Sequence, residues 1–315
     1  MSDVTTLPLP TADIAATTPR AHVPRRVGLV VHPSRNVDEP LRLVREWADE
    51  NGIELVQAPA GTTQRRVAEE GDPGQSELIV SVGGDGTTLA ALRTGAVAGR
   101  PVLGIACGSL GALATVSVRD AKRSLERFGR GEWIPRRFPA LSVARGEAGA
   151  GEDLFALNDV TVVRSSGGQV RMTVLVDGSV YARIAGDGGV VSTQIGSSGY
   201  AISAGGPLLA LGLEGFVFTP LATHGGFCPP LVIGPGSELE IDMAAGFGSG
   251  RLEIDGQVAD VRVGSLKIGL RPDVATMVSF PDQEPLLAGL RRRGIILDSP
   301  RLVAEGNRGG DACPA

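Results

Sequence analysis

The chain has 315 residues, enough for two domains and a sizeable core. Charged residues make up 21% and the formal net charge is −5, so no basic surface indicates binding to nucleic acid or to anionic lipid. No apolar run approaches the roughly 20 residues that cross a bilayer, no signal peptide precedes the first strand pattern, and the three cysteines lack metal-ligand spacing, so we expect a cytoplasmic protein without a membrane partner.

The first part of the chain alternates strand and helix patterns. Residues 1–25 are rich in Thr, Pro and Ala and predict a disordered tail. The patterns that follow are a β-branched strand Val27–Val31 ending in a His-Pro loop, an amphipathic helix from residue 37 with Gly52 after its end, a strand over 53–59, a strand over 78–82, a helix from Thr87 and a strand with its loop over 101–116. This alternation predicts an α/β domain with a parallel sheet over residues 26–138.

From about residue 139 the pattern changes to short, alternating, β-branched segments separated by Gly and Asp-Gly turns. We therefore predict a β-rich second domain over 139–270. A last segment, 271–303, contains a helix and a strand within "EPLLAGLRRRGIIL" and is a candidate for returning to the first domain. Residues 304–315 predict a second tail.

The turn "GGDG", between the strand 78–82 and its helix, is the first candidate site. Its glycines, Gly83, Gly84 and Gly86, expose backbone N–H groups beside a helix N-terminus, and both features favour an anion. The pattern is neither a Walker loop nor the dinucleotide fingerprint. A plain Asp-Gly turn is the alternative, but the longer motif through Thr87 favours a phosphate site at the carboxyl ends of the strands.

Asp85 stands inside this turn, where a carboxylate would repel a phosphate. It fits there if it holds Mg²⁺ or accepts a proton from an attacking hydroxyl, and both roles belong to phosphoryl transfer. The alternative is a side chain that caps the helix N-terminus.

Five motifs occur in the order typical of NAD kinases. They are "GGDGTTL" at 83–89, "LNDV" at 157–160, "GDGGVVSTQIGSSGYAISAGGP" at 186–207, "TPLATHGG" at 219–226 and "LEIDGQ" at 252–257. The first motif is also similar to those of diacylglycerol kinases, sphingosine kinases and 6-phosphofructokinases. The set as a whole resembles NAD kinases alone, over roughly residues 26–290.

The resemblance implies a two-domain, NAD kinase-like fold that uses ATP, or polyphosphate, and a divalent cation such as Mg²⁺ to phosphorylate the 2′-hydroxyl of the adenosine ribose of NAD. It implies that Asp85 is the base and that Gly83, Gly84, Gly86 and Thr87 bind phosphate. The acceptor would contact Asn158, Asp159, Asp187, Ser198, Tyr200 and His224. It further implies a homodimer or homotetramer, and it leaves the metal ligands unknown.

The acceptor residues also have ordinary structural explanations. Asn158 suits a base edge and Asp159 suits ribose hydroxyls, but both also fit an Asx turn. Tyr200 could stack on a ring or simply pack, and His224 could be an ordinary loop histidine. Asp187, between two glycines, could be a turn residue.

Several positions depart from the NAD kinase pattern, and most of them fall in the predicted acceptor pocket. The departures are Ala106, Ala112, Gln194, Ile195, Gly199 and Pro229. An apolar residue in place of a hydrogen-bonding one can redirect specificity strongly. Two alternatives to an NAD kinase are therefore a kinase of this fold with another hydroxyl acceptor (a nucleoside, sugar or polyol) and a catalytically silent nucleotide-binding regulator.

Overall fold

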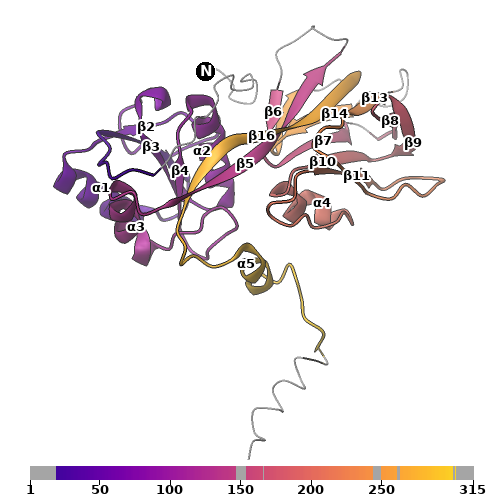
Figure 1. The fold of residues 1–315 in the computed structure, drawn as a ribbon. Helices are drawn as coiled ribbons and strands as arrows, with labels where there is room; N and C mark the ends of the chain where they lie inside the picture. The colour runs from indigo at the N-terminus through magenta and orange to yellow at the C-terminus, as the bar shows by residue number, and fades with distance from the viewer. Residues whose placement is uncertain are drawn as a thin grey trace, which may run out of the picture. The chain divides into compact units, whose positions relative to one another are not determined.

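A computed structural model describes residues 19–146, 154–165, 167–243, 250–260, 263–300 and 302. These residues form two compact units that meet in sequence after Gln283 (Figure 1). The predicted tails, 1–25 and 304–315, lie outside the described residues except for 19–25. No helix in the described ranges is long and apolar enough to cross a membrane.

The larger unit contains a ten-stranded sheet in the order β2-β1-β3-β4-β16-β13-β8-β9, with β5 paired to β16 and β6 to β5. Its strands are β1 Arg26–Val31, β2 Glu54–Gln57, β3 Leu78–Gly83, β4 Val102–Ala106, β5 Ile134–Arg145, β6 Leu154–Ala156, β8 Val170–Val176, β9 Ser179–Gly186, β13 Leu239–Met243 and β16 Ser265–Ser279. The pairs β1–β2, β1–β3, β3–β4 and β4–β16 are parallel, and the others are antiparallel. The long strand β16 thus continues the parallel sheet of the first half into the β-rich half.

Three helices, α1 Asp38–Asn51, α2 Asp85–Ala98 and α3 Ala121–Gly129, cover the two faces of the parallel part. Helix α4 Tyr200–Ser203 contacts β10 in the β-rich half, and α5 Leu286–Arg292 belongs to the smaller unit. Alternate residues of β3 point to opposite faces: Leu78 and Val80 pack in the core that contains α1 and α3, whereas Ile79 packs in the core that contains α2. Helix α1 ends at Gly52, which takes the left-handed conformation with φ +67° that glycine adopts without strain.

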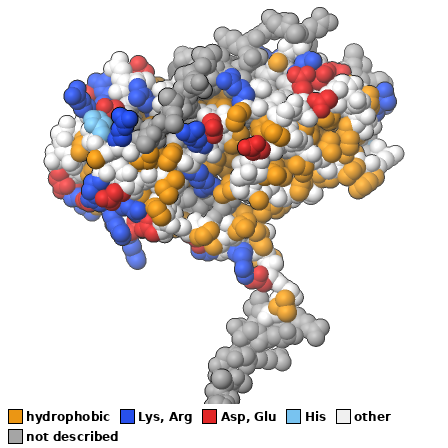
Figure 2. Space-filling view, viewed as in Figure 1, with side chains coloured by type: hydrophobic (Ala, Val, Ile, Leu, Met, Phe, Trp, Pro, Cys, Tyr) orange, Lys and Arg blue, Asp and Glu red, His pale blue; other side chains and the backbone are white. Residues whose placement is uncertain are grey.

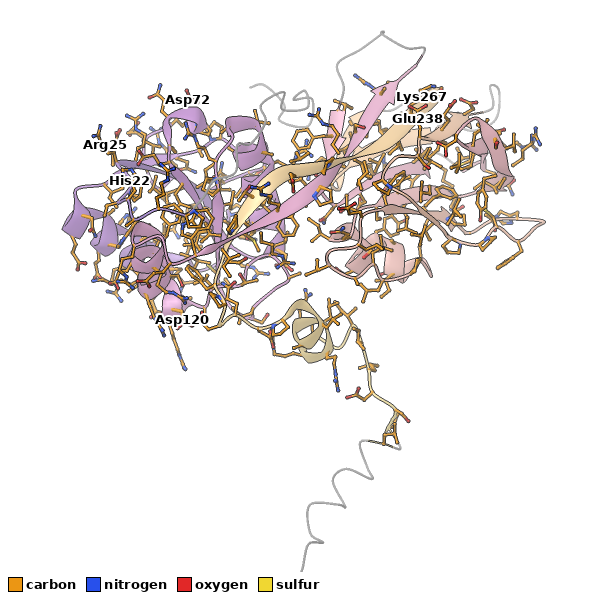
Figure 3. All side chains as sticks on the ribbon, in the orientation of Figure 1. His22, Arg25, Asp72, Asp120, Glu238 and Lys267 are labelled. Carbon is orange, nitrogen blue, oxygen red and sulfur yellow. The ribbon has the colours of Figure 1, made fainter. Side chains whose placement is uncertain are left out.

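A second, six-stranded antiparallel sheet has the order β12-β11-β10-β7-β14-β15. Its strands are β7 Asp159–Arg164, β10 Gly188–Ser192, β11 Phe216–Leu221, β12 Leu231–Ile233, β14 Gly250–Ile254 and β15 Gln257–Asp260. One face packs on the β-rich half of the first sheet, with Val160, Phe216 and Leu252 in the shared core. In the first sheet, Lys267 of β16 pairs with Glu238, the residue before β13, at 3.1 Å (Figure 3).

The predicted fold class is confirmed: a parallel-rich sheet with helices is joined to an antiparallel, β-rich half. The predicted helix in the C-terminal segment is present as α5, but the strand predicted after it is wrong. Residues 294–297 form a turn and irregular structure, and Gly294 has a φ of +72°. A short apolar run forms a strand only where a neighbouring strand pairs with it, and none does here.

Candidate active site

The glycine turn lies at the carboxyl ends of the parallel strands, as predicted. Strand β3 ends at Gly83 and α2 begins at Asp85, so the turn is a single sharp corner. A cavity of about 370 Å³ opens there. Its lining residues are Val31, His32, Pro33, Arg35, Thr62, Thr63, Gly84, Asp85, Gly86, Thr87 and Gln257.

The three glycines of this turn differ in what a side chain at their position would meet. A Cβ on Gly83 would lie 2.3 Å from Thr87 Oγ1, so Gly83 is buried beneath Thr87 and does not line the cavity. A Cβ on Gly84 would approach the Arg35 guanidinium at 3.3 Å, whereas one on Gly86 would meet open space. Gly84, Gly86 and Thr87 are therefore the predicted phosphate residues that face the cavity.

The Asp85 side chain reaches from the start of α2 to a loop beyond its own helix. It accepts backbone hydrogen bonds from the next strand's loop: Ala112 N to Oδ2 at 2.9 Å, Leu113 N to Oδ1 at 2.9 Å and Ala114 N to Oδ1 at 3.0 Å. Gly111 makes this approach possible, since a Cβ there would lie 1.8 Å from Asp85 Oδ1. The carboxylate thus ties the loop after β4 to the start of α2.

Asn158 lies in the loop between β6 and β7, and Asp159 is the first residue of β7. Asn158 Oδ1 is buried and has no hydrogen-bond partner, which is costly for a carbonyl oxygen unless a ligand donates to it. Burial, reinforced by the neighbouring Asp255 carboxylate, raises the pKa of Asp159 to about 7. Thr161 donates a hydrogen bond to Asp159 Oδ1 at 3.4 Å. Both side chains thus have unusual surroundings, as binding residues often do.

Asp187 and His224 lie together, but at the other end of β10. Asp187 N donates to Leu221 O at 3.0 Å, and His224 N donates to Ala185 O at 2.8 Å. The Asp187 carboxylate pairs with Arg164 at 3.0 Å. Asp159 pairs with Ser192 at the opposite end of β10, so the two groups are separated by the length of this strand, roughly 13 Å.

Ser198 and Tyr200 follow β10 in a short helical segment. Ser198 Oγ donates to Ile195 O at 3.0 Å, and Tyr200 is exposed at the first position of α4. Two departures from the NAD kinase pattern are buried beside them: Gln194 and Ile195. Ile195 packs in the core that contains Leu89 of α2, so its apolar side chain is accommodated by packing.

Sequence reasoning missed four residues of the site region. His32 and Arg35 line the cavity, and Arg35 donates to Cys107 O at 3.3 Å, so a positive charge stands next to Gly84. The His-Pro loop after the first strand was the available signal. Arg93 and Asp255 form a buried ion pair of 2.6 Å between α2 and the turn after β14. Asp255 stands in the motif "LEIDGQ", but nothing in the sequence pairs it with Arg93.

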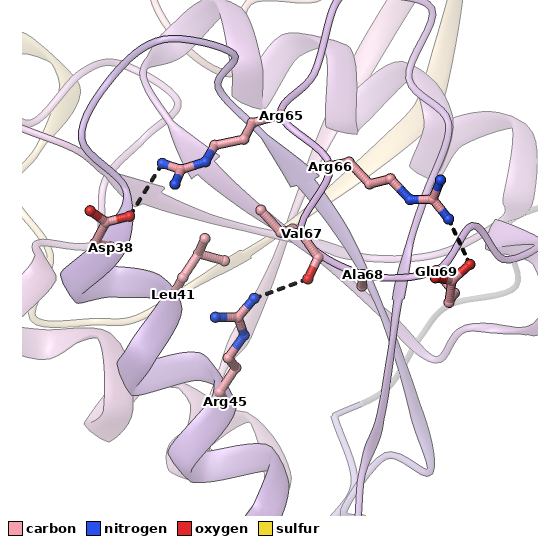
Figure 4. Close-up of a pocket in the computed structure, with 8 residues that line it drawn as sticks. All are labelled: Asp38, Leu41, Arg45, Arg65, Arg66, Val67, Ala68 and Glu69. Atoms are coloured by element: carbon pink, nitrogen blue, oxygen red, sulfur yellow. Dashed lines mark hydrogen bonds and ion pairs between the residues drawn. The ribbon is translucent and has the colours of Figure 1, made fainter.

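A larger cavity, of about 520 Å³, lies elsewhere. Three arginines line it, but each has a partner within the cavity: Arg45 donates to Val67 O, Arg65 pairs with Asp38, and Arg66 pairs with Glu69 (Figure 4). These partners engage all three arginines of this cavity, whereas Gly84, Gly86 and Thr87 line the smaller cavity beside Arg35.

Comparison with known proteins defines the class. Residues 27–133 match the ATP-NAD kinase N-terminal domain and residues 157–260 match the ATP-NAD kinase C-terminal domain. The chain therefore belongs to the NAD kinase family, and it is an enzyme, a phosphotransferase with an alcohol group as acceptor.

Individual relatives agree. NAD kinase 1 of Streptomyces coelicolor is 31% identical over 89% of this chain and 88% of its own length, and the NAD kinase of Desulforamulus reducens is 30% identical over 73% and 83%. An NAD kinase from Archaeoglobus fulgidus, solved in complex with ATP, is 25% identical with a TM-score of 0.67 and covers 86% of this chain and 100% of its own. Yeast NADH kinase, complexed with NADH, shares the fold at 19% identity, with a TM-score of 0.73 over 88% and 89% of the two chains.

Proposed function

We propose that the chain transfers the terminal phosphoryl group of ATP to the 2′-hydroxyl of the adenosine ribose of NAD, giving NADP, in the cytoplasm. The observation that carries this proposal is the corner between β3 and α2, where Gly84, Gly86 and Thr87 face a cavity of about 370 Å³. Backbone N–H groups, the N-terminus of α2 and the Arg35 guanidinium favour phosphate there.

A divalent cation, Mg²⁺ in our proposal, enters with the ATP phosphates and neutralises charge that develops during transfer. The described residues contain no group of three His, Cys, Asp or Glu side chains placed to hold a metal ion. The Asp85 carboxylate at the phosphate corner is the acidic group that fits near such a cation.

Asp85 is the base in this proposal, and the acceptor hydroxyl donates its proton to the carboxylate. Both of its oxygens accept amide hydrogen bonds from residues 112–114 in the structure. To receive the proton, the carboxylate must present a lone pair of one of its oxygens to the hydroxyl, and Oδ2, which accepts one of the three amide bonds, is the less engaged of the two.

Asn158 and Asp159 hold the adenosine part of the acceptor. Asn158 Oδ1 accepts a hydrogen bond from the ligand, which satisfies the buried oxygen, and Asp159 accepts from ribose hydroxyls. Ser198 and Tyr200, in the short helical segment after β10, line the acceptor pocket in this proposal. Gln194, Ile195 and Gly199 depart from the NAD kinase pattern in the segment that leads to Ser198 and Tyr200, which supports a second candidate: the same chemistry with another hydroxyl acceptor.

An end-point assay decides between these acceptors. Purified protein is incubated with Mg-ATP and a panel of NAD, NADH, nucleosides and sugar alcohols, and the products are identified by mass. NADP as the main product supports the proposal, and a different phosphorylated product indicates a redirected acceptor pocket. Nucleotide binding without any product would favour the silent regulator.

We also propose that the protein acts as a homodimer or homotetramer in which Asp187 and His224 serve the site of a second copy. Their distance from Asn158 within one chain supports this. Exposed large apolar side chains also gather on the β-rich half (Figure 2), where Phe227 is 91% exposed and Tyr200, Leu211, Leu213 and Val232 are exposed in nearby segments. Such a patch is typical of an interface.

A mixing experiment tests the shared site. Asp85→Asn and Asp187→Ala are each expected to be inactive alone, but co-expressed chains should regain about a quarter of the parent activity. In a dimer, half of the random assemblies contain one site with both residues intact. Activity that stays at the level of the single variants would show that both residues act within one chain.

A further inference from the structure

The ion pair between Arg93 and Asp255 links the two motifs that carry the proposed reaction. Arg93 Nη1 lies 2.6 Å from Asp255 Oδ2, and the two side chains are only 7% and 2% exposed. Arg93 comes eight residues after Asp85 on α2, about two helical turns. Asp255 belongs to the turn between β14 and β15, 162 positions later in the chain.

Asp255 holds the backbone of the acceptor loop. Its carboxylate accepts hydrogen bonds from Leu157 N at 3.1 Å, Asn158 N at 2.7 Å and Asp159 N at 3.2 Å. Its own backbone N–H donates to Asp159 O at 2.9 Å. Asp255 and Gly256 both take the left-handed backbone, with φ +50° and +75°, as the two central residues of an Asp-Gly hairpin turn between β14 and β15 do.

The opposite side of the loop is held as well, by Thr193 after β10. Thr193 Oγ1 donates to Leu157 O at 2.6 Å, and Thr193 N donates to Asn158 O at 2.9 Å. Thr193 follows β10, which pairs with the strand β7 that the loop leads into. Arg93, in contrast, belongs to α2, the helix that begins at the phosphate corner. The Arg93–Asp255 ion pair thus ties the backbone of this loop to α2.

Arg93 is itself fixed in place. Its Nη1 also donates to Phe155 O at 2.8 Å, and its guanidinium lies 4.5 Å from the centre of the Phe155 ring. A planar, delocalised guanidinium satisfies a carboxylate, a carbonyl and an aromatic face at once, which an ammonium does not. A small cavity of about 130 Å³ between Gly86 and Asp255 is lined by both partners of the pair.

We propose that Arg93 and Asp255 are a positioning pair that sets the distance between the phosphate-binding start of α2 and the acceptor loop Leu157–Asp159. This inference rests on the proposed function and extends it to two residues that touch neither substrate. A displacement of about 1 Å between reacting groups is enough to lower a rate about 100-fold. The pair therefore acts on the acceptor and leaves ATP binding, which the corner before α2 provides, nearly unchanged.

The test uses the double variant Arg93→Met/Asp255→Asn, which removes both charges and so leaves no unpaired ion in the core. We expect kcat/KM for NAD to fall about 100-fold while KM for ATP stays within about twofold. Arg93→Lys, which keeps the charge but not the planar fork, should recover part of the loss. Arg65→Met, which removes an exposed ion pair with Asp38, is the matched control and should leave all constants unchanged.

A second measurement does not depend on the acceptor. Hydrogen exchange of the Leu157–Asp159 amides should be at least about tenfold faster in Arg93→Lys, although Arg93 donates to none of them, while the amides of Val160–Val162 stay protected. Unchanged exchange, or a double variant that folds and keeps its acceptor kcat/KM, would overturn the positioning role. A parent protein that does not phosphorylate NAD would overturn the proposed function instead, and the exchange result would still decide the role of the pair.

Discussion

Replacing Asp85 with asparagine should lower kcat at least about 100-fold while ATP and NAD still bind. A base that receives the acceptor proton contributes typically 10²–10⁴-fold, and a neutral amide does not take up that proton. The measurement is steady-state kinetics, with binding of both substrates followed by calorimetry. Catalysis by the variant at the parent rate would contradict the base assignment.

The same carboxylate also anchors a loop, so the experiment needs a variant that separates the two roles. Asp85→Asn keeps a carbonyl oxygen that accepts from the amides of residues 112–114 but takes up no proton, whereas Asp85→Ala removes both functions. If Asp85 is the base, the two variants should lose similar activity, and Asp85→Ala should have the lower thermal stability. A much larger loss of kcat in Asp85→Ala than in Asp85→Asn would show that Asp85 serves mainly as an anchor. Gly86→Ala, whose Cβ meets open space, is the control for the stability measurement.

The parts of the fold that sequence reasoning predicted well are those in which a local pattern determines the structure. The apolar run of β3, the amphipathic face of α1 and the left-handed Gly52 each follow from a few neighbouring residues. The position of the glycine turn followed from the general rule for parallel sheets. The absent strand at 294–297 shows the limit, because a strand requires a partner that its own residues do not specify.

The contacts of the site were less predictable for a related reason. The partners of Asp85 are backbone amides of residues 112–114, and any residue except proline supplies such an amide. The Arg93–Asp255 pair joins residues 162 positions apart, and only the packing of α2 against the β14–β15 turn brings them together. Motif order indicated Asn158 and Asp159 as binding residues, but the unpartnered oxygen of Asn158 required coordinates.

Asp159 gives the fold an unusual dependence on pH. Burial first, and then the charge of Asp255, raises its pKa to about 7 from an ordinary value of 3.8. When the pH is below the ordinary pKa of 3.8, the Asp159 carboxyl group holds its proton in both the folded and the unfolded chain. Between about 4 and 7 the unfolded chain has released it and the folded chain retains it, so this group's contribution to stability falls as pH rises. Above about pH 7 the Asp159 carboxylate is charged in both states, and the folded chain bears the full free-energy cost of burying that charge.

Asp159→Asn removes this titration without a large change of shape, so we expect the variant to be more stable than the parent at pH 8. The gain should be at most about 4 kcal/mol at pH 8 and should shrink toward pH 4. Urea unfolding between pH 4 and pH 8.5 measures it, with the exposed Asp38→Asn as the control. The same change should weaken NAD binding if Asp159 accepts from the ribose hydroxyls, so one variant would then be more stable and less active. A variant that is less stable than the parent at pH 8 would mean that the carboxylate is held by partners that favour its charge.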